Sequence, residues 1–553
     1  MPVDLSVAEA VRAGSEHLVA GRLAKAEYVF RQVLGADPVN PHAKHGLALI
    51  ALSVGRHDVA LGLLNEAIAT RPVESPLHNS LGETYRAMNR PSEALASYDR
   101  ALLLDPAYAE AHSNRAIVLQ ALGRPEEAIA SCDAALKVRP GFAAAWSNRG
   151  VMLEQRGRLD EALASFEQAI SVAPQFLDAQ ANRASLLREL GRLDEALAAL
   201  DRVLAVNPAM AAAHDARGST LQQLLRIKEA LDSHRKAIAL KPDFALAHLH
   251  EAIALLLGGD YKDAWEKYEY RKLAHPAVAR EFDQPHWSGK KNLTGRTVLL
   301  YSEQGIGDLL QFVRYVPQVA SLGAKVVLEV PAAAKPLLRG IRGAPSVIAQ
   351  GDRLPKFDLQ CSLLSLPHAF GTTLATVPAV TPYLSVDKIA VSAWRKKLAR
   401  RGTKLVGLCW KGDPVYRKDR ERSIRLSDLQ PLLDLPGMRF VSLQKDLSEE
   451  ELALVAKRDN FGHPGKDFKD TAELVAALDL VITVDTAWAH WAGAIGKPVW
   501  VMLAHYPHWC WLLERQDSPW YPTARLFRQE KAGDWAKPLA LVKRGLAAFG
   551  RRA

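Results

Sequence analysis

A 34-residue period runs through the first half of this chain and restricts how that half folds. Proline recurs at this spacing at Pro38, Pro72, Pro106, Pro140, Pro174, Pro208, Pro242 and Pro276. Alanine keeps the same spacing at Ala26, Ala60, Ala94, Ala128, Ala162, Ala196, Ala230 and Ala264. An ungapped period of this length indicates stacked copies of one supersecondary unit, each burying its apolar face against its neighbours.

Each unit, such as "AAAWSNRGVMLEQRGRLDEALASFEQAISVAPQF", predicts a helix, a glycine turn, a second helix and a proline that ends it. The turn residues are Gly21, Gly55, Asn89, Gly123, Gly157, Gly191, Leu225 and Gly259. The alanine marks a close approach of the two helices, and large apolar residues fill the space between units. The pattern resembles the tetratricopeptide repeat, so an α superhelix of eight repeats is predicted for residues 1–276.

One repeat position predicts a partner. Asn114, Asn148 and Asn182 recur on the first helix of three consecutive repeats, and Ser80, Ala216 and His250 take this place in others. Amide side chains donate to and accept from a peptide backbone, so they are predicted to hold a protein or peptide in the groove. The repeat resembles that of O-GlcNAc transferases, and this resemblance implies a similar ladder of Asn side chains in the groove. Alternatively, each Asn bonds a neighbouring helix turn.

The last repeat departs from the others and carries Trp265, Tyr268 and Tyr270. A terminal repeat needs either a solvated cap or a docking face, and the aromatic residues favour docking. Residues 277–296 are predicted to connect it to the second half.

From Thr297 the pattern changes to short apolar runs that alternate with helical segments: "TVLLYS", "AKVVLEV", "KLVGLCW", "MRFVSL", "DLVITV" and "KPVWVML". Such runs predict parallel sheets covered on both faces. A composition break near residues 372–403 divides the region. Two facing Rossmann-like domains with a cleft between them are therefore predicted, at 297–385 on the acceptor side and 386–553 on the donor side.

Charge and composition narrow the function. Residues 281–553 carry 39 Lys and Arg against 27 Asp and Glu, a net charge of +12. The whole chain has a net charge of +10, so residues 1–280 carry −2. This favours an anionic ligand in the second half, whereas the repeats show no basic aromatic stripe for nucleic acid. No apolar run is long enough for membrane insertion, and a cytoplasmic protein is expected. The scattered cysteines fit neither a disulfide framework nor a cysteine-rich zinc site.

Three loops in the second half carry candidate chemistry. In "YSEQGIGDLLQFVRYVP", Gly305 and Gly307 allow a tight turn, and Asp308 begins the next helix as either a base or a helix cap. The third glycine of a dinucleotide fingerprint is missing. In "GLCWKGDPVYRKDRERSIRL", a basic cluster follows a strand, where guanidinium groups suit phosphate. In "VITVDTAWAHWAGAIGKPVWVM", small residues after a strand permit a phosphate at a helix end.

The motifs G-I-G-D-L-L-Q-F-x-R-Y and V-D-T-A-x-x-H resemble those of heptosyltransferase-like glycosyltransferases of the GT-B fold, over about residues 297–550. The resemblance implies that Asp308 is the base that activates the acceptor hydroxyl. It also implies a site for the diphosphate of the donor nucleotide sugar, formed by Asp485, Thr486, Ala487 and His490, with Lys411, Lys418 or Arg422 as the phosphate-binding cation. Gln444 and Lys445 resemble the segment that contacts the nucleoside or phosphate. Ala487 replaces the family's glycine.

Repeats followed by a GT-B unit resemble O-GlcNAc transferases and bacterial flagellin-modifying enzymes. The expected activity is therefore an inverting glycosyl transfer to Ser or Thr of a protein, with a nucleotide sugar as co-substrate and with no cofactor and no metal. His505 and His508 are rival bases, and Trp509, Trp511 and Trp520 are either core residues or stacking platforms for a sugar or base. A non-catalytic scaffold, and a transferase for small-molecule or lipid-linked glycans, are the alternative functions.

Overall fold

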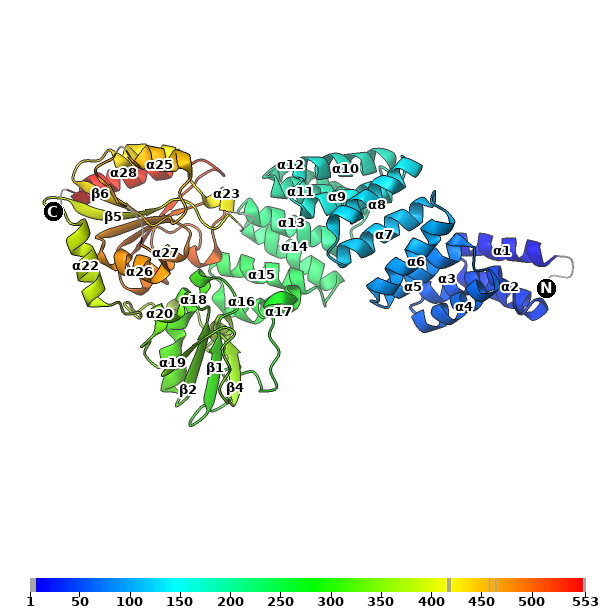
Figure 1. Ribbon diagram of the computed structural model, residues 1–553, viewed down its shortest axis with the longest axis horizontal. Helices are drawn as coiled ribbons and strands as arrows, with labels where there is room; N and C mark the ends of the chain where they lie inside the picture. Colours follow the sequence, from blue (N-terminus) through cyan, green and yellow to red (C-terminus); the bar gives the residue numbers. More distant parts are fainter. Residues whose placement is uncertain (1–5, 415–418, 457, 463–464, 551–553) are drawn as a thin grey trace. The chain divides into compact units, whose positions relative to one another are not determined.

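The computed structural model describes residues 6–414, 419–456, 458–462 and 465–550 (Figure 1). Contacts divide the chain into two compact units, Met1–Ala209 and Met210–Ala553. The predicted fold class is confirmed: tetratricopeptide-type helix pairs precede an α/β region with parallel sheets. The division between the units places the seventh and eighth repeats in the same compact unit as the α/β region.

The first unit consists of six helix pairs. Its helices are α1 (Val7–Val19), α2 (Leu23–Ala36), α3 (Pro41–Ser53), α4 (His57–Thr70), α5 (Ser75–Ala87), α6 (Pro91–Leu104), α7 (Ala109–Ala121), α8 (Pro125–Val138), α9 (Ala143–Gln155), α10 (Leu159–Val172), α11 (Leu177–Glu189) and α12 (Leu193–Val206). The eight repeated alanines of the chain are all 0% exposed, as their expected role in close helix packing requires.

The turn between the paired helices adopts a left-handed backbone conformation, whichever residue occupies it. Gly157 has φ +73°, while Asn89 and Leu225 have φ 56° and 60°. This confirms that Asn89 and Leu225 take the place of the turn glycine. A leucine pays a steric cost there because its Cβ approaches a carbonyl oxygen.

We therefore expect Leu225→Gly to stabilise the second unit by about 1 kcal/mol, since glycine adopts positive φ without this clash. The matched control is Leu224→Gly, because Leu224 has an ordinary φ of −77° and loses conformational restraint without relief of strain. The measurement is denaturant unfolding of both variants beside the parent chain. Equal destabilisation by the two substitutions would contradict a strained turn.

The second unit begins with the last two repeats. Their helices are α13 (Ala211–Gln223), α14 (Ile227–Leu240), α15 (Ala245–Gly258) and α16 (Tyr261–Tyr268), followed by the short α17 (Arg271–Ala274). The predicted docking of the last repeat is confirmed. The indole Nε1 of Trp265 donates to the carbonyl of Thr372 at 2.8 Å, and Nε1 of Trp520 donates to the hydroxyl of Tyr261 at 3.0 Å.

The sequence left open whether three tryptophans are core residues or stacking platforms, and the structure places them in the hydrophobic core of the second unit. Trp509, Trp511 and Trp520 are 3%, 0% and 0% exposed. Trp509 packs edge-on against Tyr261 and Trp265 of the last repeat. They are core residues and join the repeat to the α/β region.

The smaller sheet contains four parallel strands in the order β3-β2-β1-β4. Its strands are β1 (Thr297–Tyr301), β2 (Lys325–Val330), β3 (Ser346–Ala349) and β4 (Leu359–Ser362), and its helices are α18 (Ile306–Phe312), α19 (Val316–Ser321), α20 (Lys335–Leu338) and α21 (Leu366–Ala369). The connecting segment 277–296 packs along this sheet, where the amide of Trp287 donates to the carbonyl of Gln360 at 2.8 Å.

The larger sheet contains six parallel strands in the order β10-β9-β8-β5-β6-β7. Its strands are β5 (Lys404–Cys409), β6 (Met438–Ser442), β7 (Phe461–Gly462), β8 (Leu480–Val484), β9 (Val499–Leu503) and β10 (Ala524–Arg528). Its helices are α22 (Lys388–Leu398), α23 (Asp419–Arg422), α24 (Gln430–Leu433), α25 (Glu449–Ala456), α26 (Phe468–Ala477), α27 (Ala487–Ala494) and α28 (Ala536–Gly550).

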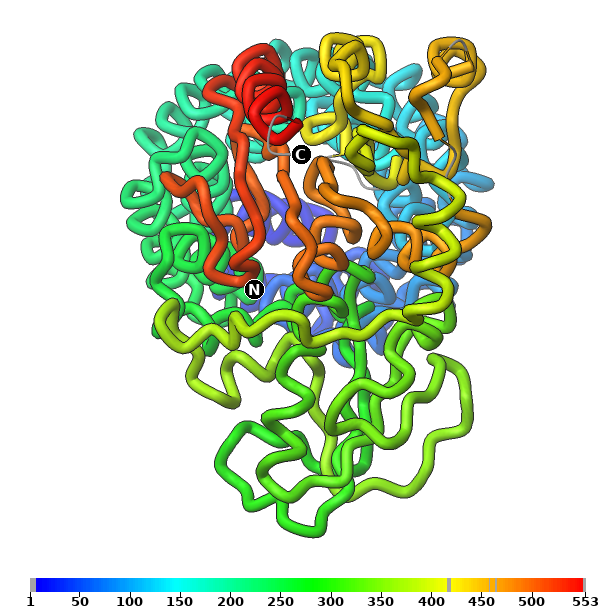
Figure 2. Tube along the Cα trace, turned by 90° about the vertical axis from the view of Figure 1, so that its left-hand side faces the viewer, coloured from blue at the N-terminus to red at the C-terminus, as the bar shows by residue number. Residues whose placement is uncertain are grey.

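Helices cover both faces of the larger sheet, as continuous apolar strands require. Helices α25 and α28 lie on one face, and α26 and α27 lie on the other (Figure 1). Residues along β5 alternate between the two cores: Val406 belongs to the buried cluster that includes Leu546 of α28, whereas Leu405 belongs to the core shared with α26 and α27. The yellow-green chain after β4 crosses to α22 in Figure 2 and connects the two sheets.

Candidate active site

Both sheets reverse their strand order next to a predicted loop. In the larger sheet β6 and β7 extend to one side of β5, while β8, β9 and β10 extend to the other. In the smaller sheet the reversal lies between β1 and β4. Ligands of α/β sheets bind at the carboxyl ends of strands at such switch points. The loop that bears Asp308 follows β1, and the loop that bears Asp485 follows β8.

The helices that follow these two loops, α18 and α27, pack against each other. Gly307 makes the approach possible, since a Cβ at this position would lie 3.1 Å from Cδ2 of His490 and 3.9 Å from Cα of Ala487. A methyl group at this position would require the His490 ring to move by a few tenths of an ångström. The structure therefore brings together the two motifs that the sequence analysis identified about 180 residues apart.

Asp308 is the third residue of α18, whose N-cap is Gly305. Burial raises the pKa of its carboxyl, His508 acts in the opposite direction, and the charge of Asp485 adds to the rise. The nearby backbone of Asp308 and Gly305 acts to lower this pKa. The N-cap position belongs to Gly305 rather than to Asp308. The raised pKa makes Asp308 a stronger base than an exposed aspartate.

The start of α27 has the features of an anion site. Its N-cap is Thr486, and no side chain caps the helix, so the first amides are not bonded by one. The Thr486 hydroxyl lies 2.9 Å from that of Thr483 and donates to Sγ of Cys409 at 3.8 Å. The thiol of Cys409 in turn donates to Oε1 of Gln444 at 3.5 Å. These contacts connect the carboxyl ends of β8, β5 and β6.

Arg422 crosses the switch point of the larger sheet. Its NH1 group donates to the carbonyl of Asp485 at 2.6 Å, and Nε donates to Oδ1 of Asp419 at 2.9 Å. Gly412 permits this course, because a Cβ there would lie 2.3 Å from the Arg422 guanidinium. Among the three predicted phosphate-binding cations, Arg422 is therefore held beside the start of α27.

Of the other two predicted phosphate-binding cations, only Lys411 lies within the described residues, and it pairs with a carboxylate. Nζ of Lys411 lies 2.6 Å from Oε2 of Glu451, a residue that also accepts from the indole of Trp410 at 2.7 Å. Lys418 lies outside the described residues. Gln444 accepts from the amide of Lys411 at 3.3 Å, and Lys445 is exposed on the same loop.

His490 is buried between the two motif helices and the core. It is 6% exposed, and its Nδ1 lies 2.9 Å from the hydroxyl of Tyr521. Burial lowers the pKa of His490 to about 4, so the ring is neutral near pH 7. A neutral ring at this place positions α27 against Tyr521 and carries no charge toward a phosphate.

The two rival bases occupy different surroundings. His508 is exposed, and its Nδ1 lies 3.1 Å from Sγ of Cys510. Its charge influences Asp308, as described above, so it belongs to the same group of side chains. The amide of His505 donates to Gln529, and burial leaves the Nδ1 atom of His505 without a hydrogen-bond partner among the described residues.

The predicted Asn ladder lies in the first unit, where the side chains pair across repeats. Nδ2 of Asn114 donates to Asn79 at 3.2 Å, and Nδ2 of Asn148 donates to Ser113 at 3.1 Å. Both bonds join first helices of adjacent repeats across 35 residues. Asn182 is half-buried at the same position. The amides of Asn114 and Asn148 thus bond a neighbouring helix, as in the alternative that the sequence left open, and each retains further hydrogen-bonding capacity.

The sequence pattern did not single out two buried arginines, of which Arg271 contacts the loop after β1 through Glu303 and Arg314 joins the end of α18 to Trp520 and Tyr383. Arg271 of α17 is 1% exposed and donates from Nε to Glu303 at 2.7 Å. Arg314 is 4% exposed and donates to the carbonyl of Trp520 at 2.7 Å and to the hydroxyl of Tyr383 at 2.9 Å. Arg314 lies within the recognised motif, so its position was a usable signal. Nothing in the local pattern pointed to Arg271.

The N-terminal half consists of tetratricopeptide repeats, and the α/β region that follows is GT-B-like. Family models described as tetratricopeptide or TPR repeats match residues 11–75 and 114–176, residues 82–123, and residues 153–219. A curated relative, Protein FlbA of Caulobacter vibrioides, is 29% identical over 333 residues. The match covers 54% of each chain, so this chain spans about half the length of that relative.

Solved structures of TPR proteins are similar to part of this chain. TTC0263 of Thermus thermophilus, a thermophilic TPR protein, is 28% identical with a TM-score of 0.30, over 33% of this chain and 99% of its own. YrrB, a TPR protein with an unusual peptide-binding site, is 26% identical with a TM-score of 0.27, over 33% of this chain and 95% of its own. Among the described residues, no helix combines the length and apolar character needed to cross a bilayer.

Proposed function

We propose that this protein is a glycosyltransferase that moves a sugar from a nucleotide diphosphate sugar to Ser or Thr hydroxyls of a protein. The observation that carries the proposal is the contact of α18 with α27 through Gly307. It brings a carboxylate of raised pKa to the uncapped start of α27. A base beside an anion site is the pair of groups that transfer from a phosphorylated donor needs.

In the proposed reaction, the acceptor oxygen attacks the anomeric carbon from one side while the bond to the diphosphate oxygen breaks on the other. A new C–O bond forms, the nucleotide diphosphate departs with the electron pair, and the configuration inverts. Asp308 takes the proton of the acceptor hydroxyl. The amides of α27, the Thr486 hydroxyl and Arg422 stabilise the charge that develops on the departing diphosphate.

The residues are assigned different tasks in this proposal. Thr486 and Arg422 contact the diphosphate, Gln444 and Lys445 meet the nucleoside or its phosphate, and His490 positions α27. Lys411 is tied to Glu451, so it contributes to the field of the site rather than to a direct phosphate contact. Ala487 presents an amide as glycine would, and its methyl group reduces the space next to the donor.

A panel of nucleotide diphosphate sugars tests the proposal, scored by donor hydrolysis and by the rise in melting temperature. We expect one donor to raise the melting temperature of the parent chain and to lose at least about tenfold in affinity in Thr486→Val, since a hydrogen bond to a charged group is lost. Thr70→Val, an exposed threonine of α4, is the matched control. If no donor in the panel is hydrolysed or raises the melting temperature, the glycosyltransferase function is contradicted and a non-catalytic scaffold is favoured.

The repeats are assigned the acceptor, because tetratricopeptide repeats typically bind proteins or peptides. We expect Asn114→Ala together with Asn148→Ala to reduce transfer to protein while donor hydrolysis stays unchanged. The readout is labelled-sugar incorporation into the protein fraction of a cell extract, with melting of the first unit as the folding control. Equal loss of both activities would contradict an acceptor role for this position.

A further inference from the structure

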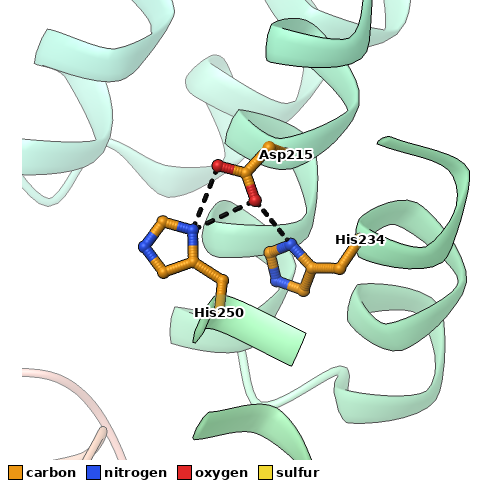
Figure 3. Close-up of side chains that lie close together, drawn as sticks. All are labelled: Asp215, His234 and His250. Carbon is orange, nitrogen blue, oxygen red and sulfur yellow. Dashed lines mark hydrogen bonds and ion pairs between the residues drawn. The ribbon is translucent and has the colours of Figure 1, made fainter. Parts of the chain in front are cut away.

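A second cluster of side chains lies in the seventh and eighth repeats. Asp215 comes from α13, His234 from α14 and His250 from α15, and Figure 3 shows both rings turned with Nδ1 toward the carboxylate. Nδ1 of His234 lies 2.8 Å from Oδ1 of Asp215, and Nδ1 of His250 lies 3.0 Å from both oxygens. One ligand atom of each residue lies within 4.8 Å of the others.

The repeat alignment shows how unusual this combination is. At the position of His234 the other repeats have Phe30, Leu64, Tyr98, Cys132, Phe166, Leu200 and Tyr268. At the position of Asp215 they have Val11, His45, Asn79, Ser113, Ser147, Ala181 and Leu249. The position of the Asn ladder is occupied by a histidine only in the eighth repeat, as His250. A carboxylate and two imidazoles therefore meet at a single repeat junction.

His234 occupies the place of a core aromatic residue. A Cβ on Gly218 would lie 2.5 Å from its Cε1, just as a Cβ on Gly150 would lie 2.6 Å from Cε1 of Phe166. His234 is 0% exposed, and its Nε2 has no hydrogen-bond partner among the described residues. An apolar ring would fill this space without the cost of burying polar nitrogens. The contact of the imidazole with Asp215 therefore accounts for a histidine at this position, because an apolar ring could not make it.

We propose that Asp215, His234 and His250 bind a divalent transition-metal ion of the zinc class, which joins helices α13, α14 and α15. Two imidazole nitrogens and a carboxylate oxygen form a ligand set that such ions accept. This proposal is independent of the proposed glycosyl transfer, and it concerns the repeats rather than a catalytic metal.

Two of the three ligand pairs need little adjustment for an ion. Ligand atoms around a tetrahedral zinc, at about 2.0–2.1 Å from the metal, lie roughly 3.3 Å apart. The pairs to Asp215 lie at 2.8 and 3.0 Å, so they separate by about 0.3–0.5 Å as the metal replaces the bridging protons. The two imidazole nitrogens lie within 4.8 Å of each other, so the partly exposed His250 ring adjusts to complete the set. The side chain of His250 is 26% exposed, which provides an entry path and room for a water as fourth ligand.

The test uses the full chain, free of any affinity tag, stripped with a chelator and titrated with Co²⁺ and then Zn²⁺. We expect visible cobalt absorption that saturates at about one ion per chain, is displaced by Zn²⁺, and accompanies a rise in melting temperature. His234→Phe and His250→Asn restore residues found at the same positions in other repeats, so both variants retain a repeat-compatible core. Each is expected to weaken binding by more than about 100-fold, because loss of a ligand exceeds loss of an outer-shell partner.

The matched control is His45→Asn, since His45 pairs with Ser80 at 2.8 Å across repeats and no carboxylate of the described residues bonds its ring. Its cobalt titration is expected to match that of the parent chain. The proposal fails if the parent chain binds no ion at micromolar concentration. It also fails if folded His234→Phe and His250→Asn bind as tightly as the parent, because the cluster is then a hydrogen-bonded Asp and two His without metal.

Discussion

Asp308→Asn is expected to lower sugar transfer by about 10²- to 10⁴-fold, the usual contribution of a general base, while donor binding is retained. The same substitution is expected to raise the melting temperature at pH 7. Burial and the nearby Asp485 raise the pKa of Asp308, so the folded state holds its proton more tightly than the unfolded state. The ionised carboxylate therefore costs stability above this pKa, and the asparagine removes that cost.

The pH dependence follows from the sign of this shift. Below the ordinary pKa of an aspartate, Asp308 is protonated in both states, so parent and variant have similar stability. As the pH rises through the raised pKa, the parent loses stability relative to the variant, while transfer by the parent appears over the same range. Asp283→Asn, at an exposed aspartate, is the matched control and leaves both profiles unchanged.

Two measurements decide the outcome: transfer rate against pH with the donor found in the panel, and melting temperature against pH. A variant that loses stability at pH 7, or that keeps full transfer, would remove Asp308 from the role of base. In the second case His508 becomes the candidate, because it is exposed and acts on the same group of side chains.

Arg271→Met is expected to destabilise the second unit by about 3–5 kcal/mol, because it leaves a buried carboxylate without its partner. The side chains of Arg271 and Glu303 are each 1% exposed, and Arg271 also contacts Glu269 at 2.7 Å and Ser365 at 2.8 Å. The pKa of Glu269 is lowered to about 2 although burial opposes the shift. The ionised Glu269 carboxylate therefore stabilises the folded state fully above the ordinary pKa of a glutamate. This contribution disappears as the pH falls toward 2.

The control for this prediction is Arg271→Met combined with Glu303→Gln, which removes the unpaired charge and is expected to recover part of the loss. Tryptophan fluorescence during denaturant unfolding reports on the second unit, since all of the twelve tryptophans except Trp146 lie in it. A loss below about 1 kcal/mol, with no recovery in the double variant, would show that the buried pair is not a structural anchor.

Much of the fold was predictable because it is encoded by short-range spacing. Helix pairs follow from the 34-residue period, and the turn at Leu225 keeps its left-handed conformation because flanking helices impose it on a residue that disfavours it. The apolar runs predicted parallel strands. The positions of Asp308 and Asp485 after strands followed from the same pattern.

The details of the site were less predictable, since they depend on partners distant in sequence. Lys411 and Arg422 look alike in a basic loop, yet Lys411 pairs with Glu451 and Arg422 with the carbonyl of Asp485. The aromatic loop with Trp509 suggested stacking as readily as core packing. Its burial follows from the last repeat, whose Tyr261 and Trp265 lie against it.

The sequence by itself determined that eight repeat units precede two groups of parallel strands, and that conspicuous loops follow β1, β5 and β8. Periodicity and strand composition are local properties, so no tertiary contact was needed to recognise them. Only the tertiary structure decided that α18 packs against α27 at Gly307, that the last two repeats pack with the α/β region, and that Asp215, His234 and His250 meet. Those contacts join segments far apart in the chain, and their geometry is set by the packing of whole helices and sheets.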